Sequence, residues 1–352
     1  MVFAPVFRRF FWPLLVFVAS GAAIWALSWG APVPFSDLFS PDAAKSEIAR
    51  RIFLELRPPR VFAAFFVGAS LSVAGAALQT MFRNPLAEPY LLGISAGGAL
   101  GATLAAALSL GTFALGTVVF EIGALWAFCG ALGAAATVYA LGKSGARRDF
   151  LPDFSGGAAL DSHAKLLLVG VALSAFLAAL MSLVVTLSGK IELSQRVAFW
   201  LLGGFGRASW PQNAVLLASF VAGISLLLLN SRDLNALRAG DRDARLLGVE
   251  TRVLHGRVLL ATSILCASSV AVAGLIGFVG LLAPHTVRLL LKKLEMNASI
   301  QTLLPASALC GAALLVLCDG LARAAFAPIE VPVGIFTALL GVPLFLSVAR
   351  RF

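Results

Sequence analysis

Charged residues are scarce in this sequence, and their scarcity excludes an ordinary soluble protein. Of the 352 residues, 12% are charged and 60% are apolar, and the mean hydropathy is +0.94. A soluble globular domain carries roughly 25% charged residues. Apolar runs of about 20 residues recur along the chain, and each suits a hydrocarbon core about 30 Å thick. Since these runs lack the period-two alternation of barrel strands, the sequence predicts an all-α polytopic membrane protein.

Reactive side chains are also few. The histidines His163, His255 and His285 are far apart, and the four cysteines fall inside apolar runs without paired spacing. This pattern indicates neither a metal site nor a disulfide framework. Glu121 and Asp319 are expected at the membrane interfaces, and the span interiors contain almost no other acid that could relay ions. We therefore expect no catalytic residue, and ion-coupled secondary transport is the less favoured class.

A nucleotide site is not indicated either. Leu141–Gly145, LGKSG, ends like a phosphate-binding loop, but such a loop needs a glycine five residues before Gly142, and that position is Thr137. An apolar run, rather than a strand, precedes the segment. We expect this chain to bind no cofactor, so that ATP and magnesium would belong to a partner ATPase.

Ten membrane spans are predicted, which places both termini on one face. They cover about residues 10–31, 60–82, 90–109, 117–141, 166–187, 211–229, 257–273, 275–291, 300–318 and 333–349. Of the 27 Lys and Arg residues, eighteen fall on the face that holds the termini and nine on the other. The positive-inside bias then places both termini in the cytoplasm. This topology and the lipid headgroups explain the net charge of +10, so nucleic acid is not an expected partner.

The nine outer cations are more than orientation alone predicts. They concentrate in Lys45–Arg60, KSEIARRIFLELRPPR, and near Arg323. One interpretation is that these long side chains reach the membrane interface while their stems stay in apolar surroundings. The other is a basic docking rim for an acidic external partner, where charge complementarity sets register and association rate. The residues themselves leave both interpretations open.

Residues 190–212 are too apolar for a loop and too interrupted for a span. They fit a short re-entrant or surface helix above a cavity, where broken backbone is tolerated. Arg196 and Arg207 would lie at the outer mouth of that cavity. Either arginine could face an anionic cargo or lipid headgroups.

The longest hydrophilic stretch is Asn230–Arg257, on the predicted cytoplasmic face. Two short amphipathic pieces are expected there, separated by Gly240, with Gly248 ending the second. Five apolar side chains interrupt the charged segment and would form a small patch: Leu234, Leu237, Leu246, Leu247 and Val249. Such a patch favours a docking element for a cytoplasmic partner, and the alternative is a helix lying on the membrane surface.

Two patterns bear on how the spans pack. Gly93, Gly97 and Gly101 recur every four residues, so one helix face could admit another backbone closely. Ser72–Phe82 is echoed by Ala271–Leu282, so spans two to five and seven to ten would form halves of opposite orientation. Inverted repeats are typical of transporters with a pathway at the repeat interface.

Four motifs, in order along the chain, resemble the FecCD/BtuC-like permeases of type II ABC importers, which carry iron chelates, haem and cobalamin. They are RNPLAEPYLLGISAGGALG (83–101), WLLGGFGRASW (200–210), ARLLGV (244–249) and AGLIGFVGLLAPHTVRLL (273–290). The resemblance runs from the RPPR element at Arg57 to the C-terminus. It implies one transmembrane permease domain over residues 1–352, with a cytoplasmic coupling segment at about 230–257.

The resemblance also implies roles for particular residues. The cytoplasmic gate would comprise Asn84, Pro85, Leu86, Ser162 and His163. The helix that couples to the ATPase would comprise Asp241, Arg242, Ala244, Arg245, Leu246, Leu247 and Gly248. Three outer arginines would pair with glutamates of the binding protein: Arg57, Arg60 and Arg323.

The assembly that the resemblance implies is a homodimer with two cytoplasmic ATPase subunits and a periplasmic substrate-binding protein, in a bacterial inner membrane. Cargo would cross between the two permease copies by alternating access. Arg196, Arg207 and His163 favour an iron chelate, either a ferric siderophore or haem, and cobalamin is the alternative cargo.

Overall fold

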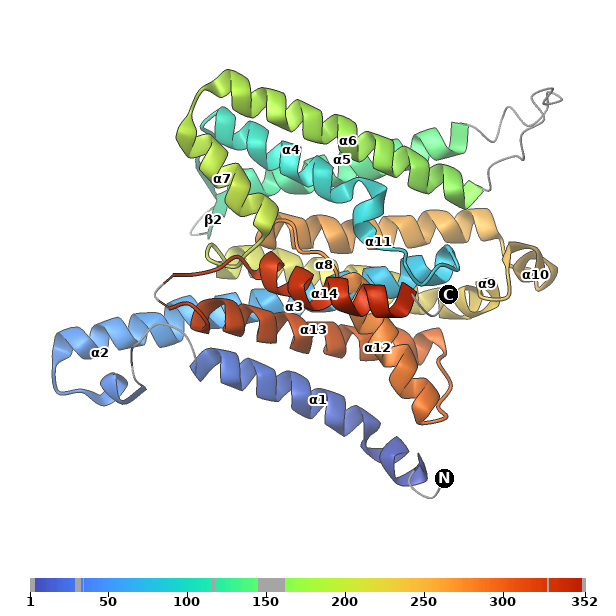
Figure 1. The fold of residues 1–352 in the computed structure, drawn as a ribbon, viewed down its shortest axis with the longest axis horizontal. Coiled ribbons are helices and arrows are strands. Elements are labelled where there is room, and N and C mark those ends of the chain that lie inside the picture. The colour runs from blue at the N-terminus through green and yellow to red at the C-terminus, as the bar shows by residue number, and fades with distance from the viewer. Residues whose placement is uncertain are drawn as a thin grey trace.

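The computed structural model describes residues 4–28, 33, 35–115, 118–144, 162–327 and 329–349 (Figure 1). Its first half contains α1 (Ala4–Ser28), η1 (Phe35–Phe39), α2 (Ala43–Arg50), the π-helical η2 (Arg51–Leu56), α3 (Arg57–Met81), η3 (Pro89–Leu92), α4 (Ile94–Ala107), β1 (Thr112–Leu115), β2 (Val118–Glu121) and α5 (Ile122–Ser144). Its second half contains α6 (Ser162–Ser188), α7 (Ile191–Leu202), α8 (Trp210–Leu229), α9 (Ser231–Leu237), α10 (Asp241–Leu246), α11 (Thr251–Ala273), α12 (Val279–Lys293), α13 (Ile300–Ala324) and α14 (Val333–Ala349). The predicted helical class is confirmed.

Each of the ten predicted spans coincides with a helix, although three of these helices are short. Seven helical segments among the described residues are long and apolar enough to cross a membrane, and α2, η2 and α3 run on as one of them. The helices α4, α12 and α14 have 14, 15 and 17 residues. The fourth span starts later than predicted, at Ile122, because residues 118–121 pair with residues 112–115 in an antiparallel hairpin.

Two helices at the centre carry the inverted arrangement. The helices α3 and α11 lie side by side and run in opposite directions (Figure 1). A non-helical segment follows each of them, residues 82–88 after α3 and residues 274–278 after α11, and a short helix comes next. Irregular backbone at membrane depth is tolerated where protein surrounds it. Both breaks belong to the motifs that carry the family resemblance.

Gly97 and Gly101 let α4 and α5 approach closely, as their spacing predicts, whereas Gly93 precedes α4 and faces Gly170 of α6. A Cβ on Gly97 would collide with the carbonyl of Gly130, and a Cβ on Gly101 would collide with the carbonyl of Trp126. Only a residue without a side chain permits this backbone contact. The glycine spacing therefore fixes the position of α4 against α5.

The two ends of the helical bundle carry different segments of the chain. The beginning of α1 and the end of α14 lie at the same end as α9 and α10, which we call the α10 end (Figure 1). The α2 helix marks the opposite end, which we call the α2 end. An even number of crossings gives this arrangement, in agreement with the ten predicted spans.

Candidate functional site

A cavity of about 700 Å³ opens at the α2 end. The helix α7, which the sequence predicted as a short element above a cavity, forms part of its wall. Arg196 and Arg207 both line this cavity, so the structure brings together the two arginines that were singled out. Glu121 and Glu192 line it as well, and the wall therefore carries both signs of charge.

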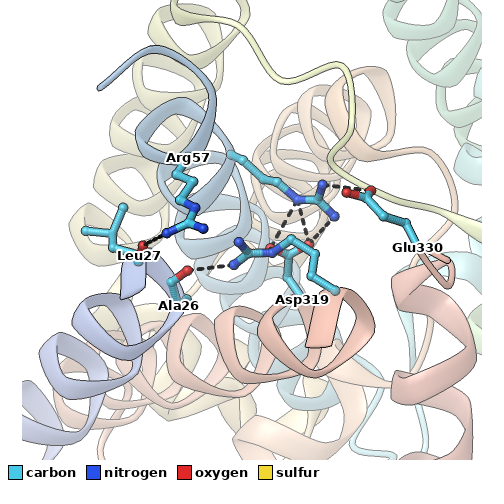
Figure 2. Close-up of polar contacts among 7 residues, drawn as sticks. Ala26, Leu27, Arg57, Asp319 and Glu330 are labelled. Atoms are coloured by element: carbon cyan, nitrogen blue, oxygen red, sulfur yellow. Dashed lines mark hydrogen bonds and ion pairs between the residues drawn. The ribbon is translucent and has the colours of Figure 1, made fainter. Parts of the chain in front are cut away.

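Next to this cavity lies a cluster of five charged residues, which we call the outer cluster (Figure 2). Arg60 is at its centre and donates from Nε to Asp319 Oδ1 at 3.0 Å and from Nη1 to Glu330 Oε2 at 2.9 Å. Arg323 pairs with the other oxygen of Asp319 at 3.2 Å. Arg57 completes the cluster. The three outer arginines predicted as a group are thus neighbours in space, although Arg323 is far from Arg57 and Arg60 in the sequence.

Two of these arginines hold the end of the first helix. Arg57 donates from Nη1 to Leu27 O at 2.8 Å, and Arg323 donates from Nη2 to Ala26 O at 2.8 Å (Figure 2). The last carbonyls of a helix have no partner within it, and cations near a C-terminus are stabilised by the helix dipole. Arg57 and Arg323 are 4% and 7% exposed. They therefore tie α1 to α3 and α13 in the isolated protomer.

Asp319 is buried within the protein, which the sequence did not predict. Its side chain is 1% exposed and lies between Arg60 and Arg323, near the end of α13. A buried charge is retained where it is paired, and here two guanidinium groups share one carboxylate. Asp319 is therefore the internal counter-ion of the outer cluster.

The predicted gate turn between α3 and α4 is held by its own side chains. Asn84 Oδ1 accepts from the backbone N–H of Leu86 at 2.9 Å, and Asn84 O accepts from Ala87 N at 3.1 Å. An Asx side chain that bonds two residues ahead stabilises a turn in place of helix. Pro85 lies within this turn and cannot donate to a helix. The local chemistry agrees with the non-helical link that the sequence predicted.

Sequence reasoning missed the contacts that join this turn to the second break. Gln79 Nε2 donates to Gly280 O at 3.1 Å, and Arg288 Nη1 donates to Gln79 Oε1. Glu88 Oε1 accepts from the backbone N–H of Phe278 at 2.6 Å. Since α12 begins directly after Phe278, the gate turn and the start of α12 are linked by hydrogen bonds.

Phe278 has an unusual backbone conformation for its residue type, with φ of +69°. Such a conformation is sparsely populated by residues with a Cβ and persists where the surroundings impose it. Its side chain packs so closely against α14 that a Cβ on Gly341 would collide with the ring. The link from Glu88 through Phe278 therefore extends to α14.

At the α10 end, the hydrophilic segment forms the two short helices that were predicted. Leu246 and Leu247 are 80% and 71% exposed, at the end of α10, and Gly248 follows with φ of +84°. The predicted patch is only partly right, because Leu234 and Leu237 of α9 are fully buried. Of the five side chains in the predicted patch, Leu246 and Leu247 are therefore the exposed ones, at the C-terminal end of α10.

The helix α9 fixes the position of α10. Asn235 accepts from Ile300 N at 3.0 Å and donates to Gln301 Oε1 at 3.0 Å, and Arg238 donates to Ala298 O at 2.8 Å. These contacts attach α9 to the start of α13. The helix α10 is thus connected to the transmembrane helices through α9.

Ser162 and His163 begin α6, but their side chains lie outside the described part of the structure. The remaining predicted coupling residues, Asp241, Arg242, Ala244 and Arg245, lie on α10. Ala244 is buried, and Asp241 Oδ2 lies 3.7 Å from His255 Nε2 on α11. Groups of His, Cys, Asp and Glu able to hold a metal ion are not found among the described residues.

Comparison with known proteins assigns this arrangement to a family. A model of the FecCD transport family matches residues 14–351, almost the whole chain. The chain belongs to the FecCD transport family. That family consists of permease subunits of ABC transporters, so the polytopic helices here are those of a permease and the predicted resemblance is confirmed.

Several curated FecCD relatives align over most of their length. The hemin transport system permease protein HmuU of Yersinia pestis is 36% identical over 96% of this chain and 93% of its own. The cobalamin import system permease protein BtuC of Halobacterium salinarum is 38% identical, over 95% of this chain and 81% of its own. The uncharacterized ABC transporter permease protein YvrB of Bacillus subtilis is also 38% identical, over 85% of this chain and 79% of its own.

A solved structure shares the fold. It is described as an inward-facing conformation of a metal-chelate type ABC transporter, and it matches with a TM-score of 0.78 and 29% identity. The match covers 98% of this chain and all of the other. The short helices and the broken segments therefore belong to the type II permease fold.

Proposed function

We propose that this chain is the permease subunit of an ABC importer that carries an iron chelate, a ferric siderophore or haem, from the periplasm to the cytoplasm. The observation that carries the proposal is the exposed Leu246–Leu247 pair on a helix fixed to the transmembrane core of a FecCD family member. An exposed apolar pair beside charged residues suits a protein partner. That partner would be the ATPase, so this chain catalyses translocation while ATP hydrolysis occurs elsewhere.

The α2 end would receive the external binding protein. Arg57, Arg60 and Arg323 are the proposed docking residues. Arg57 and Arg323 are buried and hold the end of α1, so Arg60, which lines the cavity at the α2 end, is the arginine that a partner would reach first. The outer cluster has one arginine more than it has acids, so it favours acidic side chains of a partner. In this orientation the α2 end faces the periplasm of a bacterial inner membrane, and both termini lie in the cytoplasm.

Transport would occur by alternating access between two copies of the permease. The proposed cytoplasmic gate comprises Asn84, Pro85 and Leu86 in the turn after α3, with Ser162 and His163 at the start of α6. Gln79 donates to Gly280 O in α12, and Glu88 accepts from the N–H of Phe278 directly before α12; these two bonds support the turn as a part that moves together with α12. Movement of α10 by the ATPase would reach the gate through this linked region.

The proposed cargo class rests on the cavity and on the relatives. Arg196 and Arg207 line the cavity and would attract an anionic chelate. Relatives named for hemin and for Fe(3+)-citrate support an iron chelate, and relatives named for cobalamin support the alternative cargo.

The test of this proposal is ATP hydrolysis in a reconstituted complex. The permease would be placed in nanodiscs with the ATPase that co-purifies with it, and hydrolysis would be measured with and without the loaded binding protein. We expect stimulation by the loaded binding protein. An ATPase that neither binds the permease nor responds to it would overturn the proposed function.

A further inference from the structure

Arg60 pairs with two acids that differ sharply in exposure. Asp319 is 1% exposed and is shared with Arg323, whereas the side chain of Glu330 is 59% exposed. Breaking a buried pair leaves an uncompensated buried charge, but an exposed pair contributes little to stability. Of the two acids on Arg60, Glu330 is therefore the one that another carboxylate can replace.

The geometry of Arg60 permits another carboxylate to replace Glu330 and disfavours the addition of a further carboxylate beside it. Its Nε and Nη2 both lie 3.0 Å from Asp319 Oδ1, and its Nη1 lies 2.9 Å from Glu330 Oε2. A guanidinium has five N–H donors in a fixed plane, and these contacts already use three of its nitrogens. A third carboxylate at this position would meet Glu330 at close range, and like charges there repel.

Glu330 lies in the short connection that leads into α14. Val331 N donates to Ala322 O at 3.2 Å, and Val333 N donates to Gly203 O at 3.1 Å. The residues from Glu330 to Val333 line the outer cavity together with Arg60. These backbone bonds hold the connection in place, so a displacement of the Glu330 side chain would change the charge at the cavity wall without detaching the start of α14.

We propose that Glu330 is a built-in substitute for a carboxylate of the external binding protein. In the undocked permease, Glu330 accepts a hydrogen bond from Nη1 of Arg60. On docking, an acidic side chain of the partner replaces it, and the Glu330 side chain is released from Arg60. This inference rests on the proposed function, because it requires an acidic external partner.

The exchange has two consequences for an importer. In the undocked permease, Glu330 neutralises Arg60. Docking therefore competes with the Arg60–Glu330 pair and stays reversible. Because Glu330 lines the cavity, its release also adds an unpaired carboxylate to the cavity wall when the binding protein docks.

The experiment measures the affinity of the external binding protein for the permease–ATPase complex in nanodiscs, at low salt. Glu330→Gln keeps the size of the side chain and removes its charge. The matched control is Glu192→Gln, because Glu192 lines the same cavity while the recorded ion pairs of Arg60 go to Asp319 and Glu330. We expect Glu330→Gln to bind the partner up to about fivefold more tightly, since the competing exposed pair is removed.

The outcomes separate this inference from the function on which it rests. Tighter binding by Glu330→Gln with unchanged binding by Glu192→Gln supports the exchange. Equal or weaker binding by Glu330→Gln, with the wild type still docking, overturns the exchange and leaves the importer proposal standing. If the wild type and both variants bind no external protein and the ATPase is not stimulated, the proposed function and the inference both fail.

Discussion

Asp319 shows how one buried carboxylate organises several distant segments. It holds Arg60 from α3 and Arg323 from α13, and Arg323 in turn holds the end of α1. From the sequence, an acid near the end of an apolar run was expected to face the membrane interface. The pairing could not be predicted, because it joins residues 259 positions apart and depends on how α3 packs on α13.

Replacing Asp319 tests this role at the scale of one residue. Asp319→Asn leaves two guanidinium groups without their buried counter-ion, and removing one partner of a buried pair costs about 3–5 kcal/mol. We expect the variant to lose thermal stability in detergent and to accumulate poorly in membranes.

The control for this prediction is Glu330→Gln. That substitution removes a largely exposed partner of the same arginine, where an ion pair contributes about 0–1 kcal/mol. Its melting temperature should stay close to the wild-type value. Equal melting temperatures for Asp319→Asn and Glu330→Gln would contradict the account of the outer cluster.

At the scale of elements, the apolar runs identified the helices correctly but not their ends. Hydropathy gives the existence of α4 and α12, yet both are short because a non-helical segment precedes each. Periodicity cannot reveal such a break when its residues are themselves apolar, as LIGF is at 275–278. The proline-rich turn after α3 was predictable, because Asn84, Pro85 and Pro89 have local conformational preferences.

The helices α9 and α10 show the same limit. Their existence and the ending role of Gly248 follow from local sequence, and the structure confirms both. Which leucines are exposed does not follow, since burial of Leu234 and Leu237 depends on the packing of α9 against the transmembrane helices. Only the tertiary structure shows that α9 is packed against the transmembrane helices while the end of α10 is exposed.

This separation gives a prediction for α10. Changing Leu246 and Leu247 together to Asp removes the exposed apolar pair without disturbing buried surface. We expect the permease to fold and insert normally and to lose the ATPase during co-purification, because a small apolar patch at the centre of an interface carries much of its affinity.

The control for α10 is Leu229→Asp. Leu229 is 83% exposed at the neighbouring end of α8, outside α10. This variant should retain the ATPase. Retention of the ATPase by the Leu246 and Leu247 double variant would show that coupling occurs elsewhere on the α10 end.

At the scale of the whole molecule, the α2 end and the α10 end differ in the side chains that they present, and the interrupted helices lie between them. The α2 end has charged side chains around a cavity, and the α10 end presents an apolar pair. An ion-coupled transporter would need acids free to take up and release ions within the membrane. The buried Asp319 is instead committed to two arginines, and Glu88 to the backbone of Phe278.

The most direct test of the central claim is uptake into proteoliposomes that contain the permease and its ATPase, with the binding protein outside and ATP inside. Haem, a ferric siderophore and cyanocobalamin would be offered separately. We predict ATP-dependent accumulation of haem or of the ferric siderophore, and loss of that accumulation when Leu246 and Leu247 are changed to Asp. Accumulation that persists without the ATPase and follows a proton or sodium gradient would contradict the account.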